Sequence, residues 1–192
     1  MAASAADRSG TPSSVDGSVQ PLAAQTYLGL EFANVDDQSL KLDLYLPDGE
    51  GPHPVHVFVH GGYWRAFSKA DYAFVADAVT AQGAIAAIID YSLMPKARMA
   101  VLVDQVRRAV AWVAANAGRW GGDPKAISAS GASAGAHLAS FLACRGARED
   151  AAPAMPVRSL LLVSGIYDLG PITRSFLQPE IALTAAEVAA WS

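Results

Sequence analysis

The sequence has 192 residues, of which 52% are hydrophobic and 17% charged, so one globular domain with a sizeable core is expected. Its formal net charge is −4 and it has no basic stretch, which argues against nucleic acid and anionic membrane surfaces as partners. The single cysteine, Cys144, excludes an internal disulfide and most cysteine-based metal sites, and no apolar run approaches the length of a membrane span.

The N-terminal stretch, residues 1–22, is rich in Ala, Ser, Gly and Pro and shows no periodicity. Such a composition cannot bury enough apolar surface to offset its ordering entropy, so we expect a disordered tail followed by one domain over residues 23–192. The first ten residues, MAASAADRSG, lack the apolar core of a signal peptide. A cytoplasmic location is therefore the default expectation.

The first predicted strands form a hairpin. LKLDLYL at residues 40–46 alternates strictly between apolar and polar or amphipathic positions, which predicts a half-buried strand, and QTYLGLEF at residues 25–32 is its expected antiparallel partner.

From residue 55 onward, apolar strand patterns alternate with helical ones. The predicted strands are VHVFVH (55–60), AIAAIID (84–90), AISAS (126–130) and SLLLVSG (159–165), and the predicted helices cover residues 68–83, about 99–117 and 133–144. Wholly apolar strands that alternate with helices are typical of a parallel sheet covered on both faces. The sequence thus predicts a three-layer α/β/α sandwich whose sheet is mostly parallel and begins with an antiparallel hairpin.

The pentapeptide Gly131-Ala132-Ser133-Ala134-Gly135 joins one of these strands to the next helix. A nucleophile elbow requires this setting, because the turn is so tight that the residues two positions either side of the serine must be small. The turn lifts the serine hydroxyl to a helix N-terminus, where the helix dipole favours developing negative charge. The pattern predicts Ser133 as a nucleophile, but a small-residue connection without chemistry fits the pentapeptide alone equally well.

A second loop, HGGYW at residues 60–64, follows an earlier strand and carries two adjacent glycines. Acyl transfer needs two or three N–H donors aimed at the oxygen of the tetrahedral intermediate. One donor normally comes from the residue after the nucleophile, here Ala134, and the others from a loop of this kind. Core packing is the alternative interpretation of Tyr63 and Trp64.

Five motifs, in this order, resemble the α/β-hydrolase fold, and most closely its kynurenine formamidase-like and related esterase/lipase (BD-FAE-like) branch. They are HGGYW, DYSLMP (90–95), GGDP (121–124), GASAGAHLA (131–139) and SGIYDL (164–169). The resemblance covers about residues 27–191. It implies hydrolysis of a small-molecule carboxylic ester or formyl amide through an acyl-enzyme, with no cofactor and no metal.

The resemblance also implies roles for individual residues. The implied nucleophile is Ser133, the oxyanion hole is formed by the N–H groups of Gly62, Tyr63 and Ala134, the oxyanion loop is supported by His60 and Gly61, and the acyl pocket is walled by Tyr63 and Trp64.

A base for Ser133 is harder to place. A serine hydroxyl needs a base, which needs an orienting carboxylate, and the resemblance implies the order serine, acid, histidine. The histidines are His53, His56, His60 and His137, none of them beyond the elbow helix. His60 is the best local alternative and His137 lies one helical turn after the serine, but structural roles are favoured for both. Asp168 is favoured as a cap of the segment that follows it rather than as the acid.

The end of the sequence, LTAAEVAAWS at residues 183–192, opens a new helix where the family continues with further strand–helix units. We therefore expect an incomplete hydrolase domain whose SLLLVSG strand is an exposed sheet edge, with self-association through that edge. Two hypotheses stay open: part of an active serine esterase or amidase, or a degenerate hydrolase that binds a ligand or partner. A dinucleotide-binding sheet is disfavoured, since no G-x-G-x-x-G follows a first strand.

Overall fold

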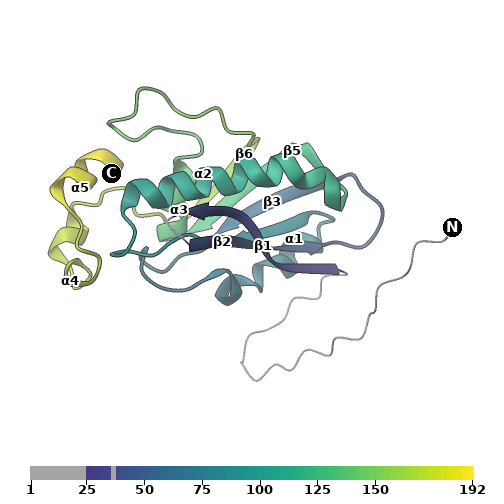
Figure 1. Ribbon diagram of the computed structural model, residues 1–192, viewed down its shortest axis with the longest axis horizontal. Helices are drawn as coiled ribbons and strands as arrows, with labels where there is room; N and C mark the ends of the chain where they lie inside the picture. The colour runs from purple at the N-terminus through teal and green to yellow at the C-terminus, as the bar shows by residue number, and fades with distance from the viewer. Residues whose placement is uncertain (1–24, 36–37) are drawn as a thin grey trace, which may run out of the picture.

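Figure 1 shows a computed structural model of the protein, which describes residues 25–35 and 38–192. The expected tail at residues 1–22 lies outside these ranges, and the domain boundary at residue 23 stays a prediction. Within the described ranges, six strands form one sheet in the order β1-β2-β4-β3-β5-β6. The strands are β1 (Gln25–Val35), β2 (Gln38–Leu46), β3 (His53–Val59), β4 (Ile85–Ile89), β5 (Gly122–Ala132) and β6 (Ser159–Val163).

The pairing of these strands confirms the expected fold class. β1 and β2 form an antiparallel hairpin and β2 is also antiparallel to β4, whereas β4, β3, β5 and β6 are mutually parallel neighbours. Parallel strands bring their carboxyl ends to one edge of a sheet, where open α/β sheets place their ligands. His60, Asp90 and Ser133 each follow directly after one of these strands and so lie at that common end.

Helices cover both faces of the sheet, which gives three layers (Figure 1). The helical elements are η1 (Lys69–Tyr72), α1 (Val75–Thr80), α2 (Met99–Asn116), η2 (Ala117–Trp120), α3 (Ala134–Ser140), η3 (Pro171–Arg174), α4 (Gln178–Ile181) and α5 (Ala185–Trp191). In β4, Ile85, Ala87 and Ile89 face the larger core with α2, α3 and α5, and Ala86 and Ile88 face the smaller core with α1. Every residue of β4 is buried, as its apolar sequence predicts.

The expected helix over residues 68–83 is wrong in detail, because two short helices, η1 and α1, take its place. The first turn is held by tertiary contacts rather than by helix continuity. The Lys69 N–H donates to Asp90 Oδ1 (2.6 Å), and its ammonium group lies 3.0 Å from Asp43. These contacts fix η1 against the end of β4 and the middle of β2, and local periodicity could not reveal them.

β6 is the outermost strand of the described sheet, as expected. Its apolar side chains are unusually exposed: Leu161 is 62% exposed, Leu162 36% and Val163 47%. Self-association through this edge stays a prediction. Of the helices in the described ranges, none has the length and apolarity needed to cross a bilayer, and the cytoplasmic location also stays a prediction.

Candidate active site

Ser133 occupies a sharp turn between β5 and α3. Its backbone has φ +53° and ψ −118°, a conformation that is costly for a residue with a side chain and persists only where the surroundings impose it. The Ser133 N–H donates to the Val163 carbonyl (2.8 Å), which fastens the turn to the end of β6. The residue is half-buried, so its side chain keeps access to solvent.

The two flanking glycines leave no room for a side chain. A β-carbon at Gly131 would collide with the Gly135 carbonyl, and one at Gly135 would collide with the carbonyls of Val59 and His60. The backbone of α3 therefore packs directly against the end of β3. This close approach is the physical reason for glycine two positions either side of Ser133.

The HGGYW loop lies against this turn. A β-carbon at Gly61 would lie 2.9 Å from the Ala132 carbonyl oxygen and 3.5 Å from Cβ of Ser133. Gly62 has φ +111°, and its carbonyl accepts hydrogen bonds from the N–H groups of Arg65 and Ala66, both at 3.0 Å. The loop and the elbow thus share one end of the sheet, side by side.

The backbone N–H groups of Gly62, Tyr63 and Ala134 are among those around this point that have no hydrogen-bond acceptor within the described ranges. Gly62 is half-buried and Ala134 is buried, and backbone donors so placed are normally paired in proteins. Open donors beside a serine can donate hydrogen bonds to a ligand oxygen.

His60 supports the loop from below. Its ring is fully buried and stacks on Tyr91 with 4.2 Å between ring centroids, and its Nδ1–H donates to the Gly61 carbonyl (2.7 Å). The Tyr91 hydroxyl donates to the carbonyl of His60 itself (2.9 Å). Burial lowers the pKa of His60, against smaller raising effects of the Gly61 carbonyl and Asp90. A neutral His60 holds the loop, and its Nε2 is 3.9 Å from Asp90 Oδ1, beyond hydrogen-bond reach.

Trp64 occupies the core beneath the loop. Its side chain is fully buried, its Nε1–H donates to His137 Nδ1 (3.2 Å), and His137 Nε2–H donates to the Trp191 carbonyl (2.7 Å). Burial lowers the pKa of His137, in keeping with this neutral tautomer. The expectation that Trp64 walls an acyl pocket is corrected accordingly, because no surface of it is accessible. Tyr63, which is 42% exposed, is the aromatic residue of the loop that faces outward.

Within the described residues, no histidine is hydrogen-bonded to Ser133 as a base. All four histidines lie in the described part of the chain, and none of them hydrogen bonds to this serine. The ring nitrogens of His53 contact the Gly83 and Gly49 carbonyls, those of His56 contact the hydroxyls of Ser128 and Ser130, and those of His60 and His137 are placed as above. Asp168 accepts the Gly170 N–H (2.8 Å), the capping role favoured from the sequence.

Two tyrosines near the site were not singled out from the sequence. Tyr91 follows Asp90 in the DYSLMP motif and holds the loop through its hydroxyl. Tyr72 lies in η1, and its hydroxyl is 2.9 Å from the β-carbon position at Gly61. No local pattern indicates either role, because both depend on how distant segments pack.

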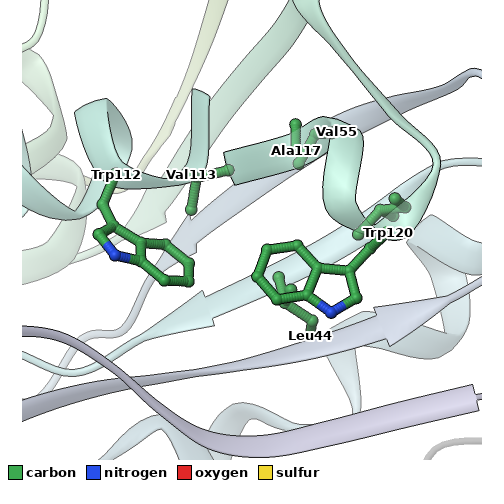
Figure 2. Close-up of a pocket in the computed structure, with 7 residues that line it drawn as sticks. Leu44, Val55, Trp112, Val113, Ala117 and Trp120 are labelled. Carbon is green, nitrogen blue, oxygen red and sulfur yellow. The ribbon is translucent and has the colours of Figure 1, made fainter. Parts of the chain in front are cut away.

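A separate apolar pocket lies at the other end of the sheet (Figure 2). It is lined by Trp112, Val113, Ala117 and Trp120, by Leu44 of β2, and by Val55 and Ile85 near the amino ends of β3 and β4. It has no charged lining residue and is remote from Ser133. In the described ranges, no group of three histidine, cysteine or acidic residues could hold a metal ion.

The BD-FAE family model matches residues 42–169. The chain belongs to the BD-FAE family. This range contains both loops of the candidate site and ends at the SGIYDL motif, so the expected resemblance to this branch of the α/β-hydrolases is confirmed.

Relatives of this BD-FAE chain are hydrolases. It is 35% identical over 162 residues to kynurenine formamidase of Danio rerio, covering 83% of this chain and 53% of that one. It is 36% identical over 105 residues to the isoprenylcysteine alpha-carbonyl methylesterase ICME of Arabidopsis thaliana, covering 54% of this chain and 25% of that one. The chain spans about half the length of the kynurenine formamidases it matches.

Solved structures agree with this assignment. Thermogutta terrifontis esterase 2 phosphorylated by paraoxon superimposes with a TM-score of 0.64 at 27% identity, covering 75% of this chain and 58% of that one. The carboxylesterase EstE1 from a metagenomic library gives 0.60 at 26% identity, covering 65% and 42% respectively. The α/β-hydrolase ancestry of this BD-FAE chain is therefore shown.

Proposed function

We propose that Ser133 is the nucleophile of a hydrolase that cleaves small-molecule carboxylic esters or formyl amides through an acyl-enzyme. The observation that carries this proposal is the strained turn at Ser133 beside the unpaired N–H groups of Gly62, Tyr63 and Ala134. Relatives named as a formamidase and a methylesterase support these two substrate classes.

In this reaction the Ser133 hydroxyl oxygen attacks the substrate carbonyl carbon and its proton passes to a base. The carbonyl oxygen becomes an oxyanion, which these three N–H groups stabilise by hydrogen bonds. The tetrahedral centre then collapses, the C–O or C–N bond breaks, and the leaving group takes the proton. Water repeats the sequence on the acyl-serine and releases the acid.

The proposal assigns the nucleophile and the oxyanion hole to described residues, but none of the described histidines hydrogen bonds to Ser133. Removing the acid and base of a serine triad typically leaves a residual rate about 10³- to 10⁴-fold over water, from the hole and binding alone. We propose that the 192 residues act at this residual level. The open base position also favours the second candidate, a hydrolase-derived module that binds its ligand without turnover.

The test is acetylation by p-nitrophenyl acetate, followed by intact mass, peptide mapping and nitrophenolate release. We expect one acetyl group on the peptide that contains Ser133 and none in Ser133→Ala. Ser130→Ala is the matched control, since this serine lies three positions earlier and is bonded to His56. Acetylation that is equal in wild type and Ser133→Ala would refute the proposed nucleophile. An acetyl-enzyme that forms but is not hydrolysed would favour the binding module.

A further inference from the structure

Tyr72 presents its ring edge-on and face-on to an aromatic cluster beside the candidate site. Its ring centroid lies 5.5 Å from that of Phe58, 6.2 Å from Phe67, 5.9 Å from Phe74 and 6.0 Å from His60. Aromatic pairs at such separations stabilise one another beyond the area they bury. The ring is therefore held in one place on several sides.

The helix that carries Tyr72 is also fastened in place. At the start of η1, the Asp71 carboxylate accepts hydrogen bonds from the N–H (2.8 Å) and the hydroxyl (2.9 Å) of Ser68. Lys69 adds its N–H bond to Asp90 and its ion pair with Asp43. A short helix with these anchors aims the Tyr72 side chain in a defined direction.

The end of this side chain reaches Gly61, which lies beside the nucleophile. The Tyr72 hydroxyl lies 2.9 Å from the position that a β-carbon would take at Gly61, and Cβ of Ser133 lies 3.5 Å from the same point. Any side chain at residue 61 would therefore meet both groups. Glycine at this position allows the hydroxyl of Tyr72 and Cβ of Ser133 both to lie close to residue 61.

The hydroxyl of Tyr72 makes no hydrogen bond within the described ranges, although the residue is half-buried. The neighbouring Tyr91 differs, because its hydroxyl is fully used by the carbonyls of His60 (2.9 Å) and Gly61 (3.4 Å). A phenol hydroxyl carries one proton to donate, and a half-buried donor without an acceptor has hydrogen-bonding capacity for a ligand. Tyr91 thus holds the loop, whereas Tyr72 offers a donor to the space above it.

We propose that the Tyr72 hydroxyl is a further catalytic hydrogen-bond donor, which binds the substrate's acyl oxygen as this oxygen becomes an oxyanion. This inference rests on the proposed function of Ser133. The proton stays on Tyr72 throughout, as in the backbone N–H donors.

The test uses phenylphosphonate, a tetrahedral anion that resembles the oxyanion and forms no covalent bond, titrated into the 192-residue chain and followed by NMR. Tyr72→Phe keeps the ring and its aromatic contacts and removes only the donor. A hydrogen bond to a charged acceptor contributes strongly to the free energy of binding, so its loss should weaken binding about 10-fold or more. Tyr27→Phe is the matched control on β1, where the ring packs on Trp120 at the remote end.

Equal affinities of wild type and Tyr72→Phe, or no binding to wild type, would overturn the role of Tyr72. Ser133→Ala separates the two proposals, since it removes the nucleophile but leaves every other donor in place. Binding that depends on Tyr72 in a protein whose Ser133 is not acetylated would support the donor and refute only the nucleophile.

Discussion

β4 and β6 are five-residue strands of one sheet with similar apolar sequences, IAAII and SLLLV, yet their surroundings are opposite. Every residue of β4 is buried, because β2 and β3 flank it and a core covers each face. β6 pairs with β5 alone among the described strands, and Leu161 and Val163 are about half exposed or more. An apolar run therefore predicts a strand suited to burial on both faces, but its neighbours decide whether the burial occurs.

The sharpest test of this contrast removes one aliphatic side chain from each strand. Ile89→Ala in β4 leaves a cavity in the larger core and should lower the free energy of unfolding by about 2–5 kcal/mol. Leu161→Ala in β6 removes a side chain that already meets water and should change it by no more than about 0.5 kcal/mol. Urea unfolding followed by circular dichroism measures both.

The contrast would break if Leu161→Ala proved nearly as costly as Ile89→Ala. Such a result would mean that the apolar face of β6 is covered in solution, by a second copy or by another segment. Repeating the measurement at lower protein concentration would distinguish these two, since only self-association depends on concentration.

The contrast between β4 and β6 also shows how far local sequence can predict the fold. The hairpin, the parallel strands and the elbow follow from short-range patterns, because alternation, apolar runs and glycine spacing are fixed by backbone geometry. The split of residues 68–83 into η1 and α1 does not, since Lys69 is drawn to Asp43 and Asp90 from other strands. The candidate site shows the same difference. Gly131 and Gly135 predict the turn from the sequence, whereas the core position of Trp64 depends on its packing with His137 and Trp191.

The well-packed part of the molecule should also respond to pH, because three of the histidines lie there, His56, His60 and His137, whereas no histidine occurs after residue 137. Burial lowers the pKa values of His56, His60 and His137 below the ordinary 6.5. As the pH falls through that value, these histidines take up protons in the unfolded chain but stay neutral in the folded protein. Stability must then fall as pH drops through about 6.5. We expect a lower urea midpoint at about pH 6.0 than at about pH 7.5.

His56→Gln tests the cause. Glutamine can still hydrogen bond with Ser128 and Ser130 but does not titrate, so the variant should lose less stability on acidification than wild type. Asp90 changes stability with pH in the opposite direction, because burial raises the pKa of its carboxyl. Both proteins contain Asp90, so its contribution cancels when their pH slopes are compared. Identical pH slopes in the two proteins would show that His56 is not a source of the effect.

The last and smallest effect on stability concerns the two edges of the sheet. β1 has two register irregularities along its pairing with β2 and carries Glu31, devices that discourage another strand from adding to an edge. β6 has neither a register irregularity nor a charge within Ser159–Val163, so we expect concentration-dependent self-association through it.

Leu161→Lys should suppress that association, because a charge on an apolar edge strand is costly to bury between two copies, while unfolding changes by no more than about 0.5 kcal/mol. Leu28→Lys on β1 is the matched control, since both leucines are 62% exposed and lie on opposite edges. Sedimentation velocity over a range of concentrations decides the matter. Wild type that stays monomeric throughout, or two lysine variants that behave alike, would show that the exposed apolar side chains of β6 form no specific contact. The edge at β6 would then differ from the edge at β1 only in the regularity of its strand pairing.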